Sequence, residues 1–109
     1  MSDVDLESEL ASLKAGYRLA LPEKLDKLEA LLRAAKAVPG RESFDAARRV
    51  AHTLMGSAGS YGFDALCREL RRIELDLEGL LGDSPPDFDQ AWPGIERAFA
   101  QARAALVAA

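Results

Sequence analysis

Side chains that could act as nucleophiles gather in one stretch of the sequence. Residues 52–62 read H-T-L-M-G-S-A-G-S-Y-G and hold the chain's one histidine, His52, followed by Ser57 and Ser60. The one cysteine, Cys67, comes shortly after. An ordinary imidazole is largely neutral near pH 7 and keeps a ring-nitrogen lone pair, so His52 is the first candidate for nucleophilic chemistry.

The other candidates are weaker. Neither Ser57 nor Ser60 has an acid–base partner at helical spacing, so both are interpreted as small packing residues. Cys67 lies on an apolar helical pattern and is expected to be a buried structural thiol. One histidine and one cysteine cannot form a disulfide or a metal-ligand cluster of useful spacing, and the chain has no G-x-x-x-x-G-K-[ST] loop. We expect no metal, no cofactor and no autokinase activity.

Apolar residues spaced by three or four positions predict five helices that hold these groups. The first begins near Ser2 or Asp3, and Pro22 is expected to start a second helix that ends at residues 38–40. Ser43 is the predicted N-cap of the third helix and Gly62 its C-terminal cap. The fourth helix stops at Gly82. Pro93 either confines the fifth helix to residues after about 90 or kinks it.

The helices carry one apolar stripe each, which predicts a single all-α domain over residues 1–109. We expect an antiparallel up-and-down four-helix bundle with an additional N-terminal helix lying across one end. The predicted buried stripes are Leu6, Leu10, Leu13 and Tyr17; Leu25, Leu28, Leu32 and Ala35; Phe44, Ala47, Ala51, Leu54, Ala58 and Tyr61; Phe63, Leu66, Leu70, Ile73, Leu77 and Leu80; and Phe88, Trp92, Ile95, Phe99, Ala102 and Leu106.

The core face of the third helix predicts where His52 points. A helical residue turns by about 100°, so His52 faces outward if Leu54 is in the core. Gly56 and Gly59 each cost roughly 0.5–1 kcal/mol of helix stability relative to alanine. Gly56 lies one turn after His52 on the same side, so it leaves the imidazole uncovered for a close approach by another protein.

These residues resemble the signature of histidine-containing phosphotransfer (HPt) domains of bacterial two-component phosphorelays. The pattern H-x-L-K-G-[S/A]-[S/A]-x-x-x-G matches from His52 to Gly62 except at Met55 and is followed by the leucine-rich helix with Leu66, Leu70 and Glu74. The resemblance implies that His52 accepts a phosphoryl group from an aspartyl phosphate of a receiver domain and passes it to another receiver, which supplies the Mg²⁺.

The resemblance also implies which residues surround the phosphohistidine. Gly56 and Gly59 are expected at the docking surface. The family usually has lysine where this chain has Met55, and Arg48, one turn before His52, is the first candidate for the missing cation, ahead of Arg49 and Arg71.

Charge and hydropathy indicate the compartment and the partners. The net charge of −4 argues against nucleic acid, although residues 41–72 hold six arginines and four acids. The acidic N-terminus does not resemble a secretory signal, and no apolar run approaches the roughly 20 residues that span a bilayer. We therefore expect a cytoplasmic monomer whose partners are receiver domains of response regulators or hybrid histidine kinases, with no membrane contact.

Two alternatives remain at this stage. A non-catalytic bundle could bind or sequester a receiver domain, and it would tolerate glutamine at position 52. A receiver phosphatase would transfer the phosphoryl group to water.

Overall fold

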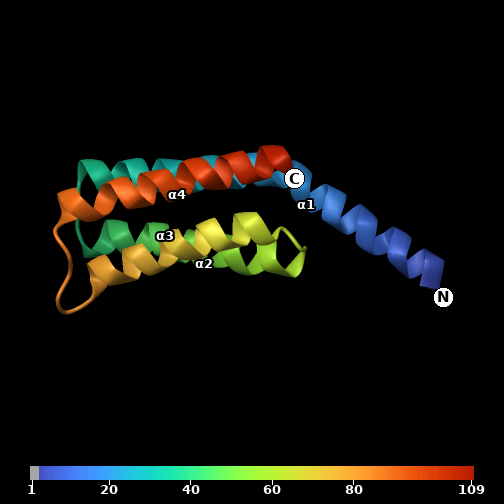
Figure 1. Cartoon of the computed structure of the whole chain (residues 1–109), viewed down its shortest axis with the longest axis horizontal. Helices are drawn as coiled ribbons and strands as arrows, with labels where there is room; N and C mark the ends of the chain where they lie inside the picture. Colours follow the sequence, from blue (N-terminus) through green and yellow to red (C-terminus); the bar gives the residue numbers. More distant parts are fainter. Residues whose placement is uncertain (1–2) are drawn as a thin grey trace.

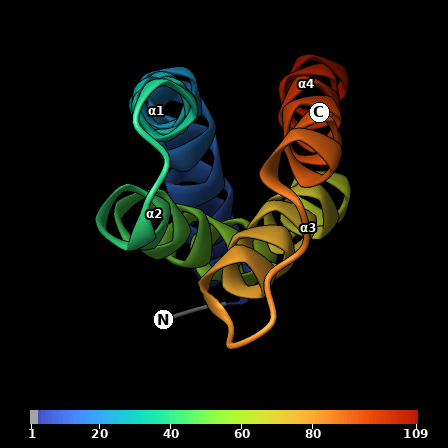
Figure 2. The ribbon, with the colours of Figure 1, turned by 90° about the vertical axis from the view of Figure 1, so that its left-hand side faces the viewer.

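Four antiparallel helices form the described part of the protein. The computed structural model describes residues 3–109, which contain α1 (Asp3–Ala37), α2 (Arg41–Ser60), α3 (Asp64–Leu81) and α4 (Phe88–Ala108) and no strand. Seen end-on, the helices stand at the corners of a square, and each lies beside its neighbour in the chain (Figure 2). The fourth side is closed by α4 against α1. The predicted all-α bundle is confirmed.

One stripe from each helix enters a common core, as amphipathic helices require. The predicted stripes of α2, α3 and α4 are confirmed except at two edge residues, Tyr61 and Phe88, which are half-buried. The buried side chains are Leu21, Leu25, Leu28, Leu32 and Ala35 of α1; Phe44, Ala47, Ala51, Leu54 and Ala58 of α2; Phe63 of the α2–α3 turn; Leu66, Leu70, Ile73, Leu77 and Leu80 of α3; and Trp92, Ile95, Ala98, Phe99, Ala102 and Leu106 of α4.

The prediction of five helices is wrong at Pro22, which lies inside α1. Proline removes one backbone hydrogen bond and strains the preceding turn, but Pro22 is exposed, so solvent can satisfy the carbonyl that loses its partner. Leu21 and Leu25 are fully buried on either side of it. Because core packing continues in helical register across the proline, the helix does not end there. Ser2, the alternative start, lies outside the described residues.

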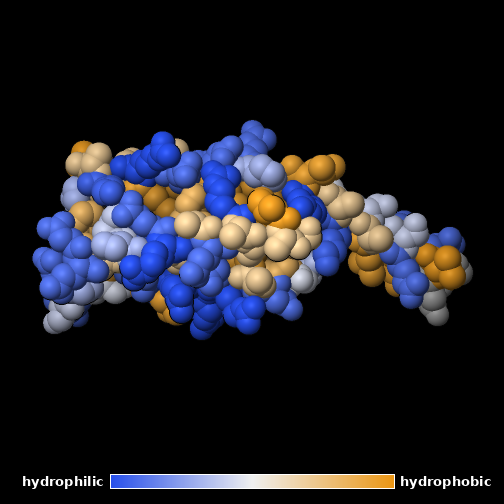
Figure 3. Space-filling model, turned by 45° about the horizontal axis from the view of Figure 1, so that its top comes forward, coloured by the Kyte–Doolittle hydropathy of each residue, from blue (hydrophilic) through white to orange (hydrophobic). Residues whose placement is uncertain are grey.

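The first part of α1 extends beyond the bundle and does not lie across its end (Figure 1). Leu6, Leu10 and Leu13 are 49–56% exposed, and apolar side chains are visible on this extension in Figure 3. Contact with the rest of the protein begins where Lys14 lies over the Phe63 ring and Tyr17 stacks on Tyr61, with ring centroids 4.5 Å apart. The predicted burial of the Leu6, Leu10 and Leu13 stripe is therefore wrong.

The turn between α2 and α3 fixes the end of the helix that carries His52. Gly62 has φ +82°, a left-handed conformation that favours glycine. The amide of Gly62 donates to Gly59 O, and that of Phe63 donates to Ala58 O at 2.9 Å. This pair of bonds is a Schellman motif, so the predicted cap is confirmed.

The other helix starts differ from the sequence interpretation in detail. α2 begins at Arg41, with Gly40 at the N-cap, so the prediction that Ser43 is the N-cap is wrong. The Ser43 hydroxyl instead donates to the carbonyls of Val38 and Gly40, and the Gly40 carbonyl also accepts from the Phe44 amide. At the start of α4, the Asp87 side chain accepts from the Gln90 amide, and Pro93 lies inside the helix.

Candidate functional site

His52 lies on the outer side of α2, next to α3. Its side chain is 61% exposed, whereas Ala51 and Leu54 beside it are buried. The expectation that the core face of α2 turns this imidazole outward is confirmed. The position is well away from both helix ends, so backbone hydrogen bonds hold the residue on either side.

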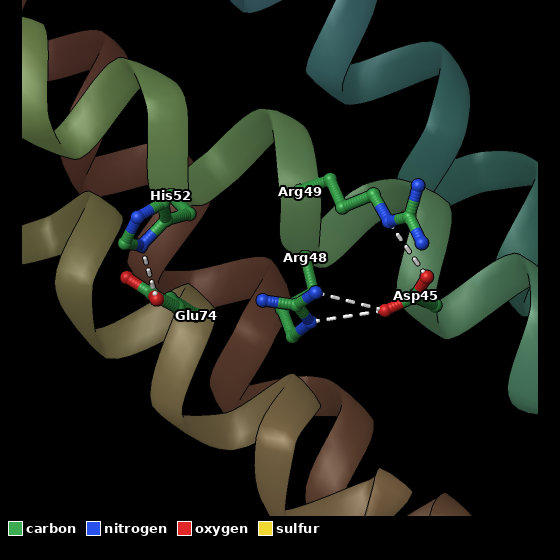
Figure 4. Close-up of polar contacts among 5 residues, drawn as sticks. All are labelled: Asp45, Arg48, Arg49, His52 and Glu74. Atoms are coloured by element: carbon green, nitrogen blue, oxygen red, sulfur yellow. Dashed lines mark hydrogen bonds and ion pairs between the residues drawn. The ribbon is translucent and has the colours of Figure 1, made fainter.

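A carboxylate of α3 holds the imidazole. Nδ1 of His52 lies 2.6 Å from Oε1 of Glu74, and the Glu74 side chain is only 10% exposed (Figure 4). Among the charged side chains of residues 3–109, Glu74 is the one that is buried. A buried carboxylate is costly unless it is paired and hydrogen-bonded, and His52 supplies that partner.

This contact decides which ring nitrogen is available. An ionised carboxylate only accepts hydrogen bonds, so the proton of a neutral His52 lies on Nδ1. Nε2 then carries the lone pair, and it points away from Glu74 (Figure 4). The arrangement presents an oriented nucleophilic nitrogen at the surface, with a negative charge behind the ring.

Asp45 binds both arginines that precede His52. Nε and one terminal nitrogen of Arg48 donate to Asp45 Oδ1 at 3.1 and 2.9 Å, and Arg49 Nε lies 2.8 Å from Oδ2 (Figure 4). The hydrogen bond from Arg48 is the main reason that the pKa of Asp45 is below its usual value, with further help from the Arg49 charge. The Arg49 side chain is 75% exposed and extends away from His52 (Figure 4).

The two glycines after His52 have different surroundings. A Cβ atom at Gly56 would meet nothing within 4 Å, whereas one at Gly59 would lie 3.3 Å from Cys67 Sγ. Gly56 therefore leaves open space beside the imidazole, and Gly59 allows α3 to approach α2 closely.

Met55 of α2 and Cys67 of α3 meet where the two helices are in contact. Met55 is half-buried against the core. Cys67 is half-buried rather than fully buried as expected, and its thiol donates to the Met55 carbonyl at 3.4 Å.

Comparison with known proteins identifies the family. The model of the Hpt domain matches residues 8–106, nearly the whole chain. The chain belongs to the Hpt domain family. Hpt domains are phosphocarrier modules of two-component phosphorelays and interact with receiver domains. No curated protein and no solved structure gives a significant match.

The hydrogen-bond partner of His52 is the residue of the candidate site that sequence reasoning missed. Glu74 was noted only as part of the helix that follows the signature. Yet it stands among Leu70, Ile73 and Leu77, on the face where the spacing requires apolar residues. A carboxylate on a core face needs a partner, and this signal could have identified Glu74 from the sequence.

Across residues 3–109, no three histidine, cysteine or acidic side chains come together as metal ligands could. None of the four helices has a stretch apolar and long enough to span a lipid bilayer.

Proposed function

We propose that this Hpt domain is a stoichiometric phosphoryl carrier that shuttles a phosphoryl group between aspartates of receiver domains through a phosphohistidine at His52. Residues 1–109 act as one cytoplasmic Hpt domain without autokinase activity of its own. The observation that supports this role best is the pairing of an exposed imidazole with a buried carboxylate, at 2.6 Å between Nδ1 and Oε1.

The acceptance step is a displacement at phosphorus. The Nε2 lone pair of His52 attacks the phosphorus atom of an aspartyl phosphate on a docked receiver. The N–P bond forms while the bond between phosphorus and the aspartate oxygen breaks, and the aspartate leaves as a carboxylate. In the reverse direction a receiver carboxylate attacks the phosphorus atom, and the imidazole leaves neutral.

Glu74 supports both directions. When Nε2 forms the bond to phosphorus while Nδ1 keeps its proton, the ring acquires positive charge. The carboxylate of Glu74, which accepts the Nδ1 hydrogen bond, stabilises that charge. Because Glu74 is nearly buried, water screens this interaction less than it would at the surface.

The other predicted site residues form the docking surface in this proposal. Gly56 leaves the space through which the receiver's active site reaches Nε2. Arg48 and Arg49 carry one positive charge beyond what Asp45 neutralises, which attracts the acidic pocket of a receiver. Met55 and Gly59 shape the surface between α2 and α3.

Replacement of the nucleophile tests the proposal. His52→Gln should keep the helical content and melting temperature, because the side chain is mostly exposed, but should lose all acid-labile labelling from a phosphorylated receiver domain. Ser57→Ala is the control, since its hydroxyl donates to the Thr53 carbonyl and should not accept the label. Undiminished acid-labile labelling of His52→Gln would refute the role of His52. A parent protein that binds receivers and never becomes labelled would indicate a sequestering module.

A further inference from the structure

A phosphoryl group on exposed His52 would bring negative charge to the surface. Met55, at the position where the family usually has lysine, carries no positive charge to balance it. Three arginines could balance the phosphoryl charge: Arg48, Arg49 and Arg71. Asp45 occupies two of the three guanidinium nitrogens of Arg48, and it holds Arg49 on a side chain that extends away from the imidazole (Figure 4). The local positive charge of α2 is therefore already partly neutralised.

The contacts between α2 and α3 fix which residues face each other. His52 pairs with Glu74, and Gly59 lies against Cys67. Moving seven residues forward on α2 thus corresponds to moving seven residues back on α3, as two antiparallel helices with equal rise require. Met55 is three residues after His52 on α2, and Arg71 is three residues before Glu74 on α3. Met55 and Arg71 are therefore level with each other along the bundle.

Arg71 also lies on the correct side of α3. Residues three and four apart are neighbours on a helix surface, so Arg71 stands between Cys67 and Glu74, both of which contact α2. Its side chain is exposed, and among residues 3–109 no carboxylate pairs with it. Across from it, the surface at Gly56 is open. The axial offset from His52 is about 4.5 Å, which a long guanidinium side chain can span.

We infer that Arg71 binds the phosphoryl group on His52, donating from α3 to the non-bridging phosphoryl oxygens. The inference rests on the proposed role of His52 as phosphoacceptor. The guanidinium of Arg71 enters the open surface over Gly56, level with the position where the family usually has lysine. A planar guanidinium can donate two parallel hydrogen bonds to one phosphoryl group. The cation that α2 lacks at Met55 is thus supplied by the neighbouring helix.

Arg72 provides the matched control. It follows Arg71 directly on α3 and carries the same charge, but it lines a hollow with Asp76, Gly94 and Arg97 on the side of α4. A change in net charge affects both variants equally, whereas loss of a phosphoryl contact affects only one.

The experiment uses the full chain and one receiver domain, phosphorylated with acetyl phosphate, that labels the parent protein. Transfer rates are measured at fixed ionic strength, because salt screens surface charge. Arg71→Ala should slow transfer about fivefold to tenfold, the effect of losing a partly screened charge-assisted hydrogen bond. It should also shorten the lifetime of the isolated phosphohistidine form. Arg72→Ala should leave both quantities unchanged, and Arg71→Lys should lose less than Arg71→Ala.

A second substitution, on α2, tests the inference most directly. Met55→Lys in the Arg71→Ala background should restore part of the rate, since it places a cation at the same level of the bundle. The inference is overturned if Arg71→Ala matches the parent, if Arg71→Ala and Arg72→Ala are slowed equally, or if Arg48→Ala alone reproduces the loss. It also falls if the parent takes no label from any receiver, but then all arginine variants are unlabelled too, which marks a failure of the proposed function.

Discussion

Replacement of Glu74 by glutamine should slow phosphoryl acceptance at His52 about tenfold and leave the bundle folded. Glutamine has nearly the shape of glutamate, and its carbonyl oxygen can still accept the hydrogen bond from Nδ1. The tautomer of His52 is therefore kept, and the change removes only the negative charge behind the ring.

The size of the effect follows from the geometry of the pair. A hydrogen bond to a charged group contributes roughly 1.5–3 kcal/mol and a neutral one about 1 kcal/mol. Losing the charge while keeping a neutral hydrogen bond therefore costs roughly 0.5–2 kcal/mol. The contact is 2.6 Å long and Glu74 is nearly buried, but His52 is 61% exposed, so a value inside this range applies rather than its upper limit. About 1.4 kcal/mol of lost transition-state stabilisation corresponds to a tenfold change in rate.

The assay is the rate of label transfer from one phosphorylated receiver domain at fixed pH and ionic strength. Glu78→Gln is the control, because Glu78 is exposed one turn further along α3 and its loss changes the net charge equally. Glu74→Ala also removes the hydrogen bond that keeps the proton of His52 on Nδ1. The transfer rate of Glu74→Ala should therefore be lower than that of Glu74→Gln. A Glu74→Gln variant as fast as the parent, or as inactive as His52→Gln, would refute this account of the pair.

Three other predictions test the fold and the surface. Gly56→Leu should stabilise α2 by up to about 1 kcal/mol, measured by thermal unfolding, and block transfer, because leucine favours the helix but fills the space beside the imidazole. Leu10→Ala should change the free energy of unfolding by less than about 0.5 kcal/mol, whereas Leu25→Ala, at a fully buried position, should cost about 2–5 kcal/mol. Arg48→Ala should raise the carboxyl pKa of Asp45 toward its ordinary value, measured by NMR titration. Because that pKa is depressed in the folded parent, the pairing stabilises the fold above the ordinary carboxyl pKa and is lost as the pH falls through the depressed one.

The helix faces were predictable because local periodicity carries them. From Leu66 to Leu80 the apolar spacing alone selects the buried side of α3, and glycine chemistry identifies the turn at Gly62. The continuity of α1 was not predictable from local rules, since proline usually starts or ends a helix. Packing on both sides of Pro22 outweighs that preference, and packing is a property of the whole bundle.

The site shows the same division between local and long-range information. His52 and its exposure follow from one helix. Its pairing with Glu74 depends on the register of two helices, which no spacing within either one specifies. The same holds for Arg71, whose position opposite Met55 becomes visible only when two contacts between α2 and α3 are known.

The glycines beside His52 therefore serve two different purposes, and they can be separated. At Gly59 a side chain would press on Cys67, so the absence of a Cβ is explained by the packing of α3. At Gly56 a Cβ atom would meet nothing within 4 Å beyond its own stretch of helix, so internal packing gives no reason to accept the helix-stability cost of glycine. Gly79 of α3 is open in the same way, but it comes five residues after Glu74 and therefore faces about 140° away from it around the helix. If the reason at Gly56 is access of a receiver to Nε2, Gly56→Leu and Gly79→Leu should both stabilise the fold, and only Gly56→Leu should block transfer. Equal transfer by the two variants would remove the link between Gly56 and docking.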